Sequence, residues 1–258
     1  MVTVEDGKEN HESPNKAISK ENAPVSSELQ NSQKHWFEFD GSVLKRIKEE
    51  YQQYHGELYI PMDTSCIGMS AFKDCVGLTS VIFSNNVTGI ARQAFEGCIS
   101  LKKVIIPKGL NVIGEASFSH CTNLTDIIVP DSVTEIYSFA FSGAGLTNFI
   151  IPKGIKQIRS CTFSSCTNLE SITIPASVTY ISDYVFSKSQ KLSMINYPST
   201  KSQWNAIEKK EGWDKNSGPY IIHCTDGDIL PCLSEKSAEI ISAHKSFAEK
   251  QNEEIYYR

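Results

Sequence analysis

Apolar residues in the middle of the chain recur at a fixed interval. The clearest marker is phenylalanine, with successive spacings of 23, 23, 23, 22 and 23 residues, at Phe72, Phe95, Phe118, Phe141, Phe163 and Phe186. Six residues after each of them, or five in one case, comes a leucine: Leu78, Leu101, Leu124, Leu146, Leu169 and Leu192. Two independent markers with one period predict a stack of repeats in which each unit is one coil of a solenoid.

Each unit opens with residues that are typical of a short strand. In the unit that begins at Leu124 the apolar side chains are Leu124, Ile127 and Val129, and a proline follows. β-Branched residues favour strands, and proline ends a ladder because it has no N–H to donate. The proline recurs at Pro107, Pro130, Pro152, Pro175 and Pro198, and Ser84 takes its place in the first unit. We expect the apolar positions of the strand to point inward, where only neighbouring coils can cover them.

The remainder of each unit predicts an irregular return segment, so that each coil holds one short parallel strand. Two apolar residues three positions apart, such as Val133 and Ile136, precede Phe141, and this spacing suits a tight return. The unit with the 22-residue spacing is one residue short in its turn, where Gly143 and Gly145 supply the φ values of a tighter bend. We interpret it as a local adjustment that keeps the strand register on both sides.

A small side chain follows each phenylalanine by three residues. Cysteine fills this slot at Cys75, Cys98, Cys121 and Cys166, and Ala144 and Ser189 replace it in the other two units. Free cysteine is commonly a small buried side chain, so we prefer packing over redox or metal chemistry as the explanation. Side chains stacked in register point the same way, which keeps their Cβ atoms farther apart than the roughly 3.8 Å mean of disulfides. We therefore predict buried free thiols.

The N-terminal part of the chain differs from the repeats. Residues 1–35 are polar with few aromatic side chains, which predicts a disordered leader or linker. Residues 36–57 predict a helix that caps the first coil, because their apolar residues fall on one helical face, at Val43, Leu44, Ile47, Tyr51 and Tyr54. The repeats then occupy residues 58–198, as a partial first unit and about six full units.

The C-terminal part predicts a cap and a tail. Residues 199–230 contain Trp204 and Trp213, which are large enough to cover the last coil; a platform for carbohydrate is the alternative function of these rings. Residues 231–258 predict an amphipathic helix with one apolar face, at Ile240, Ile241, His244, Phe247 and Ala248. We expect this helix either to pack back on the solenoid or to join a partner.

Composition and motifs narrow the function. With 40% hydrophobic and 21% charged residues the chain is an ordinary globular protein, and its net charge of -5 gives no reason to bind nucleic acid or anionic membrane. No apolar run is long enough for a transmembrane helix. The sequence lacks a phosphate loop, a zincin helix and a nucleophile elbow, so we expect neither an enzyme nor a cofactor. The local cluster of candidate metal ligands lacks a paired Cys-x-x-Cys: His223, Cys224, Asp226, Asp228 and Cys232.

The repeat unit resembles a known family. The pattern Leu-x-x-Val-x-Ile-Pro, then Val-x-x-Ile, then Ala-Phe-x-x-Cys is similar to the BspA-like leucine-rich repeats of many bacterial and protozoan surface proteins, from about Ile60 to Pro198. Residues 203–207 (QWNAI), 212–214 (GWD) and 220–228 (YIIHCTDGD) resemble the segment that often closes such arrays. The resemblance implies a curved solenoid used for adhesion or protein binding, often at the cell surface. Residues 1–20 show no secretory signal, so the chain is either intracellular or has lost its signal.

The outward residues of the strands supply the candidate binding site. One column reads Ile82, Ile105, Ile128, Ile150, Thr173 and Asn196, and beside it run Ser80, Lys103, Asp126, Asn148, Ser171 and Met194. Isoleucine is a good strand former, which explains such residues without any function. A continuous apolar ladder, however, tends to mark an interaction site. We expect this face, with Lys103, Asp126 and Asn148 at its rim, to dock a partner protein or the chain's own terminal helix. The alternative is a scaffold or carbohydrate-binding accessory to an enzyme located elsewhere.

Overall fold

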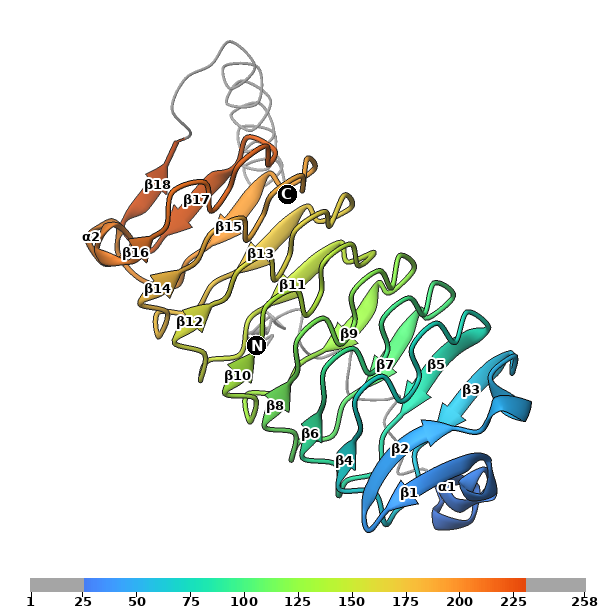
Figure 1. Ribbon diagram of the computed structural model, residues 1–258. Coiled ribbons are helices and arrows are strands. Elements are labelled where there is room, and N and C mark those ends of the chain that lie inside the picture. Colours follow the sequence, from blue (N-terminus) through green and yellow to red (C-terminus); the bar gives the residue numbers. More distant parts are fainter. Residues whose placement is uncertain (1–25, 231–258) are drawn as a thin grey trace, which may run out of the picture.

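The chain winds into a stack of coils that carry strands on two walls (Figure 1). This is a computed structural model, and it describes residues 26–230. The first wall holds the longer strands in two groups. The N-terminal group is parallel and consists of β3 (Gly56–Tyr59), β5 (Leu78–Ile82), β7 (Lys103–Ile105) and β9 (Asp126–Ile128). The C-terminal group consists of β11 (Asn148–Ile150), β13 (Ser171–Thr173), β15 (Met194–Asn196), β17 (Ile221–Cys224) and an antiparallel β18 (Gly227–Ile229).

The second wall consists mostly of two-residue strands. Its N-terminal group is β1 (Phe37–Asp40), β2 (Val43–Ile47), β4 (Cys66–Ile67), β6 (Gly89–Ile90), β8 (Val112–Ile113) and β10 (Glu135–Ile136). Its C-terminal group is β12 (Gln157–Ile158), β14 (Tyr180–Ile181) and β16 (Glu208–Lys209). The expectation of one strand per coil is therefore wrong. The Val-x-x-Ile segment is extended, and its backbone groups find partners in the coils on either side, as Ile90 does with Ile113.

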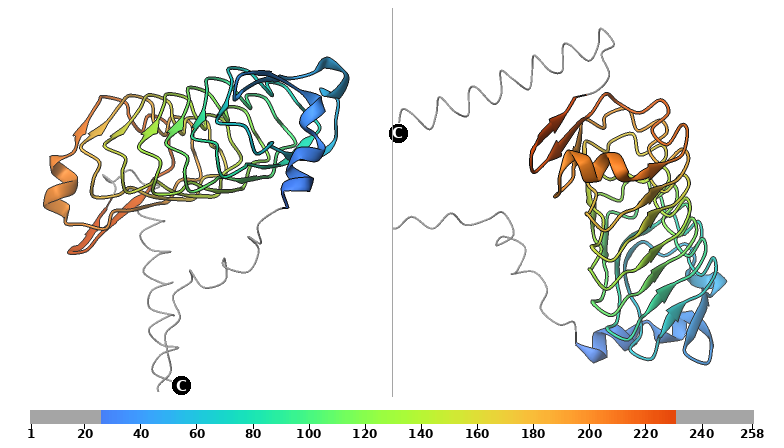
Figure 2. Two further views of the ribbon diagram at one scale, coloured as in Figure 1. Left: turned by 90° about the horizontal axis from the view of Figure 1, so that it is seen from below. Right: turned by 90° about the vertical axis from the view of Figure 1, so that its left-hand side faces the viewer.

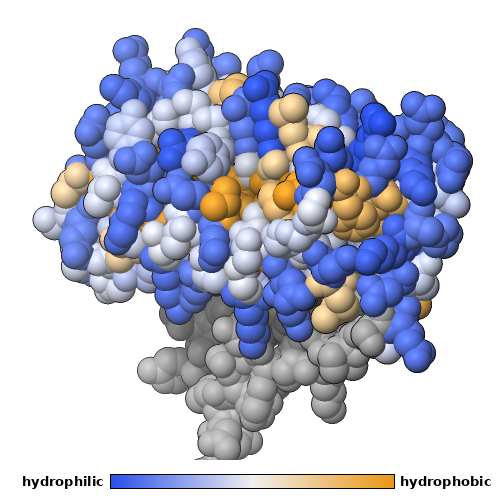
Figure 3. All heavy atoms as spheres, turned by 60° about the horizontal axis from the view of Figure 1, so that its bottom comes forward, coloured by the Kyte–Doolittle hydropathy of each residue, from blue (hydrophilic) through white to orange (hydrophobic). Residues whose placement is uncertain are grey.

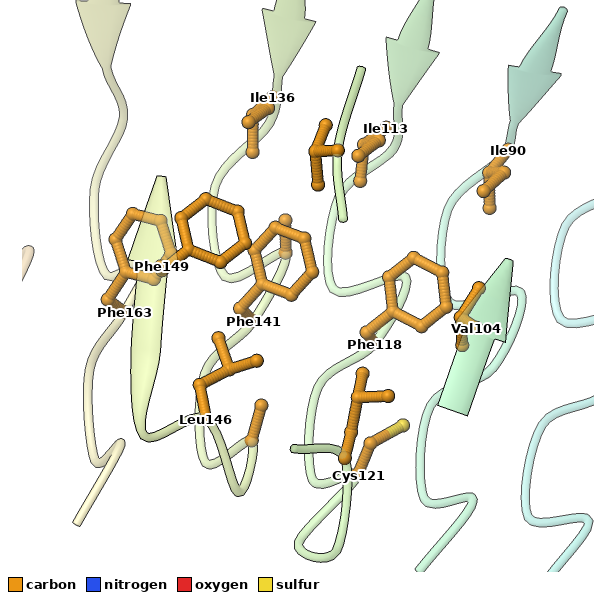
Figure 4. Packing of buried hydrophobic residues seen from close by; sticks show 14 of the residues in the cluster. Ile90, Val104, Ile113, Phe118, Cys121, Ile136, Phe141, Leu146, Phe149 and Phe163 are labelled. Carbon is orange, nitrogen blue, oxygen red and sulfur yellow. The ribbon is translucent and has the colours of Figure 1, made fainter. Parts of the chain in front are cut away.

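The interior is filled by a column of phenylalanine rings along one corner of the coils (Figure 4). The rings of Phe95 and Phe118 stack with centroids 5.3 Å apart and planes inclined by 2°. Phe118 and Phe141 follow at 5.6 Å and 4°. Equal positions in successive coils produce this parallel stacking, and such an aromatic pair contributes roughly 0.5–1.5 kcal/mol beyond its buried area. The predicted repeat is thus confirmed by its core.

The apolar strand positions point inward as expected, with two exceptions. Leu124 is fully buried and Val129 nearly so, whereas Ile127 in β9 is only half-buried. The equivalent residues of the neighbouring coils, Val104 and Phe149, are buried. Ile106, which is equivalent to Val129, is also only half-buried.

Both walls are interrupted at the same level of the stack, which we call the seam. Within residues 26–230, β9 does not pair with β11, and β10 does not pair with β12. The corner with the phenylalanine column continues without a break, since the Phe141 N–H donates to the Thr162 carbonyl at 3.0 Å. The seam coincides with the 22-residue unit. Each strand group keeps its own register, as expected. The two groups are not joined by ladder hydrogen bonds, however, where the one residue is missing.

Contacts that involve the side chains of Asp131, Lys153, Glu135 and Arg159 join the two sides of the seam, where the strands do not pair. The backbone N–H of Lys153 donates to Asp131 Oδ1 at 3.1 Å, and Lys153 Nζ lies 3.4 Å from Asp131 Oδ2. On the second wall, Arg159 Nη2 lies 2.8 Å from Glu135 Oε2. These contacts join the last coil before the seam to the first coil after it.

The segment 36–57, expected to be a capping helix, forms a hairpin instead. Strands β1 and β2 pair antiparallel around a turn in which Gly41 has a φ of 58°. Phe37, Leu44 and Ile47 are buried against the first coil, and β2 continues the second wall beside β4. Apolar spacings of three and four residues fit a helix, but a glycine turn between residues of high strand propensity favours the hairpin. A 3-10 turn follows at Glu49–Tyr51.

Part of the segment expected to be disordered is folded. Residues 26–35 include the helix α1 (Ser27–Ser32) and the start of a 3-10 turn (Lys34–Trp36). The buried side chain of Gln33 fixes this segment to β3, because it accepts from the Tyr59 N–H at 2.8 Å and donates to the Glu57 carbonyl at 3.1 Å. Residues 1–25 lie outside the described part of the chain.

The two ends of the array are closed, as Figure 2 shows, by α1 with the hairpin at one end and by α2 with β17 and β18 at the other. Helix α2 (Lys201–Ala206) begins with a capping box between Thr200 and Gln203. Trp204 is 3% exposed, and the half-buried Trp213 ring lies 5.8 Å from that of Phe186. The tryptophans therefore cover the last coil, and Trp204 is not accessible as a carbohydrate platform. The expected tail helix, 231–258, lies outside the described residues.

Candidate functional site

The predicted columns exist on the outer face of the first wall, where strand pairing sets their register. Ile82, Ile105 and Ile128 are paired in β5, β7 and β9, and Ile150 begins the same column after the seam in β11. We call these four residues the isoleucine ladder. Thr173 and Asn196 continue the column in the C-terminal group, as expected, and the seam divides the column between Ile128 and Ile150.

The exposure of the ladder is uneven. Ile82 and Ile105 are half-buried, whereas Ile128 is 57% and Ile150 is 68% exposed. Ile82 has a paired neighbour on both sides, Tyr59 and Ile105, and such neighbours shield a side chain. Ile128 and Ile150 each have such a neighbour on one side only. The accessible apolar surface of this face is therefore concentrated at the seam.

A polar column runs beside the ladder, as predicted. Lys103 Nζ lies 3.7 Å from Asp126 Oδ2, and the two side chains are 39% and 57% exposed. After the seam, Ser171 donates to Asn148 Oδ1 at 2.6 Å. Exposed pairs of this kind contribute about 0–1 kcal/mol to stability. Their arrangement matches the hydrated polar rim that surrounds the apolar centre of many interfaces.

The repeated cysteines are packed inside the corner. Cys98 Sγ donates to the Phe72 carbonyl at 3.1 Å, and Cys166 Sγ donates to the Phe141 carbonyl at 3.0 Å. Burial raises the pKa of Cys75 to about 11 and that of Cys166 to about 12, so both thiols stay protonated at neutral pH. Ser189 takes the same role, since its hydroxyl donates to the Phe163 carbonyl at 2.8 Å. The slot therefore selects a small side chain, which also donates a hydrogen bond where it is Cys98, Cys166 or Ser189, and this supports the packing interpretation over a reactive thiol.

The suspected ligand cluster near β17 and β18 is a simple pair. His223 Nδ1 lies 2.7 Å from Asp228 Oδ1. No group of three or more side chains suited to a metal ion converges between residues 26 and 230. Cys232 lies outside that range. No helix within the same range is long and apolar enough to cross a bilayer.

On one face of the molecule, hydrophobic residues gather along the middle between hydrophilic ones (Figure 3). Three exposed aromatic residues lie outside the ladder. At the corner between the second wall and the phenylalanine column, Tyr137 is 40%, Phe139 43% and Tyr184 42% exposed. These residues are not part of the repeat pattern, but a comparison of equivalent positions in the sequence would have found them. They are aromatic where other units have small or polar residues, at Gly68, Ser70, Ala91, Gln93, Gly114 and Ala116.

Comparisons with known proteins agree with the geometry. A model of the BspA type leucine-rich repeat region matches in six copies, over residues 51–169 and 90–208. Among curated proteins no match is found. Solved structures share the fold. A T. pallidum leucine-rich repeat protein is 24% identical with a TM-score of 0.56, over 62% of this chain and 79% of that one.

Two further solved structures are longer than this chain. A leucine-rich repeat protein from Eubacterium ventriosum is 21% identical with a TM-score of 0.57, over 75% of this chain and 52% of that one. One from Bacteroides ovatus is 24% identical with a TM-score of 0.49, over 63% of this chain and 53% of that one. The matched part is thus about half the length of these two proteins.

Proposed function

We propose, on the premise that the chain belongs to the family of BspA-type leucine-rich repeats, that it is a non-catalytic module whose isoleucine ladder docks a partner protein. Membership of this family supports protein interaction as the general function. Adhesion at the cell surface is the more specific role that we propose. The observation that carries the proposal is the exposure of Ile128 and Ile150, at 57% and 68%. Removal of apolar surface of this kind from water is favourable by roughly 25 cal/mol per Å², and the entropic cost of association opposes this gain.

Strand propensity alone does not account for the ladder. Thr173 and Asn196 occupy the same column in the C-terminal group, where their strands pair in register. The column therefore does not require isoleucine for folding. Four isoleucines in successive coils form an apolar stripe, and the polar side chains of Lys103, Asp126 and Asn148 beside it supply specificity.

The test is capture of a partner from native extract by the intact chain and by an Ile128→Lys/Ile150→Lys variant. Both side chains are mostly in solvent, so the variant should keep the circular dichroism of the parent. We expect its affinity for any captured partner to fall by about tenfold or more, as for the central residues of an interface. Ile99→Lys is the matched control, because Ile99 is 47% exposed in a turn outside the strands. Unchanged capture by the double variant moves the site off this face.

The chain's own terminal segment is the competing occupant. A chain that ends at residue 230 should capture the same partner at the same level if the partner alone uses the ladder. Stronger capture by the shortened chain would show that residues 231–258 compete for the face. A synthetic peptide of those residues, added to the shortened chain, should then reduce capture again.

A further inference from the structure

A second surface, unrelated to the isoleucine ladder, lies at the corner after the second wall. We call Tyr137, Phe139 and Tyr184, together with the polar side chains of Ser160, Ser182 and Asp183, the corner platform. Phe139 and Tyr184 occupy equivalent positions two coils apart, with Cys161 between them. The coils are joined there by backbone hydrogen bonds, from Phe139 N–H to the Ser160 carbonyl at 3.1 Å and from Cys161 N–H to the Asp183 carbonyl at 3.2 Å. The rings are therefore held on a continuous backbone.

Neither backbone preference nor packing explains the rings. Phe139 has a φ of 60° and Tyr184 a φ of 55°, in the left-handed region that bulky side chains rarely adopt. The equivalent Ser70, Gln93 and Ala116 share this conformation, so the coil imposes it without a large side chain. Phe139 is 43% and Tyr184 42% exposed. Large side chains kept at strained, exposed positions point to a binding role.

Hydrogen-bonding groups adjoin Cys161 and Tyr184 in the chain and contact one another. Ser160 and Ser182 donate to Asp183 Oδ1 at 2.5 and 2.9 Å. These two hydrogen bonds lower the pKa of Asp183, so its carboxylate is charged at neutral pH. Tyr137 is held in place by Arg159, whose guanidinium carbon lies 4.7 Å from the ring centroid. Arg159 is itself paired with Glu135 across the seam.

We propose that the corner platform binds a neutral glycan. The C–H faces of pyranose rings stack on exposed aromatic rings, and sugar hydroxyls donate to a carboxylate and to the oxygens of serine hydroxyls. Successive coils are about 4.8 Å apart, so Phe139 and Tyr184 are roughly 10 Å apart, which favours a chain of several sugars over a single one.

The same observations disfavour other ligands. The charged carboxylate of Asp183 repels nucleic acid and acidic polysaccharides. Of the nearby cations, Arg159 is already paired with Glu135, and Lys210 acts on Asp183 itself, whose pKa it helps to lower. A protein partner prefers a contiguous apolar centre. Here the aromatic residues are accompanied by the hydrogen-bonded group of Ser160, Ser182 and Asp183 instead.

The test is native electrophoresis of the full chain through gels that contain laminarin, yeast mannan or arabinoxylan, with heparin as the acidic comparison. We expect retardation by at least one of the three neutral polysaccharides. A Phe139→Ala/Tyr184→Ala variant should weaken that binding by roughly tenfold or more, because both stacking surfaces are lost. Tyr184→Phe keeps the ring and should retain binding, and Asp183→Asn should weaken it less than the double variant.

The controls separate this site from the isoleucine ladder. Ile128→Lys/Ile150→Lys should be retarded like the parent, and circular dichroism should show that every variant is folded. Three results would overturn the proposal: no retardation by any neutral polysaccharide, retardation by heparin alone, or equal retardation of the Phe139→Ala/Tyr184→Ala variant. A protein captured by the parent and lost from that variant, without glycan binding, would assign the platform to protein docking instead.

Discussion

The seam separates two kinds of region in one stack: the corner that contains the phenylalanine column, and the two strand walls. At the corner, Phe118 N–H donates to the Ala140 carbonyl at 2.8 Å before the seam, and Phe141 N–H donates to the Thr162 carbonyl at 3.0 Å across it. On the walls, pairing stops at β9 and β10 and resumes at β11 and β12. A unit one residue short is thus accommodated on the walls, while the corner keeps its geometry.

The difference follows from what each region buries. The corner packs large rings in parallel stacks, and a displacement of one ring would disturb two neighbours, because protein interiors are close-packed. A wall strand of two or three residues loses only a few ladder hydrogen bonds when it separates from its neighbour, and water or side chains replace them. The cost of the seam is therefore lower on the walls. Its consequence is the exposure of Ile128 and Ile150, which are the proposed docking residues.

The largest effect that tests this comparison is a pair of truncations at the seam. Phe141→Ala should lower the free energy of unfolding by roughly 3–5 kcal/mol, because it leaves a cavity in the ring column. Ile127→Ala, on the half-buried wall position, should cost clearly less than the roughly 2–5 kcal/mol of a fully buried isoleucine. Urea unfolding of both variants measures the difference. Equal losses would mean that wall and corner contribute alike, against the comparison.

The sequence predicts the corner better than the walls for the same physical reason. Phe72 to Phe186 mark the period because each ring fills an equivalent space, and burial of large apolar groups is written directly in the sequence. The seam was visible only as a spacing of 22, and whether one missing residue breaks a ladder depends on the tertiary fit of both coils. The hairpin at residues 36–57 was missed because apolar spacings of three and four suit either structure.

The candidate site shows the same limit. The isoleucine column was predictable, since residues alternate between the two faces of a strand. The uneven exposure of this column was not predictable. Ile82 has a paired neighbour on both sides, whereas Ile150 has none on the side of the seam. The exposed rings of Phe139 and Tyr184 follow from a corner geometry with positive φ that no single unit reveals.

A smaller effect tests the turn that creates the seam. A Cβ atom placed on Gly145 would lie 2.3 Å from the Thr122 carbonyl oxygen, so Gly145→Ala requires a backbone shift. We expect a loss of roughly 1–3 kcal/mol in the free energy of unfolding, as for overpacked sites. Gly109→Ala is the matched control, because the nearest atom to its added Cβ is the Asn85 carbonyl oxygen at 3.6 Å. Thermal unfolding of the two variants compares them, and similar midpoints would show that the turn adapts without strain.

The smallest effect concerns the charges that bridge the walls at the seam. Hydrogen bonds from Lys153, led by its backbone N–H, lower the pKa of Asp131, whose side chain is 60% exposed. A lowered pKa means that the pairing stabilises the fold above the ordinary carboxyl pKa of about 3.9 and that this contribution is lost as the pH falls through the folded-state value. Asp131→Asn keeps an acceptor for the Lys153 N–H but removes the charge. At neutral pH and low salt it should cost about 0.2–1 kcal/mol, as for exposed pairs.

The pH dependence of that cost separates a charge effect from a packing effect. Urea unfolding of the parent and of Asp131→Asn should give different midpoints at neutral pH and converging midpoints as the pH falls through the lowered pKa of Asp131, where the parent's carboxyl becomes protonated as well. About 1 M salt at neutral pH should also narrow the difference, because the screening length is then roughly 3 Å. A difference that persists in acid would assign the contribution of Asp131 to the shape of the turn. The walls would then be joined at the seam by packing, as the corner is, and the contrast between the two regions would be smaller than their hydrogen bonds indicate.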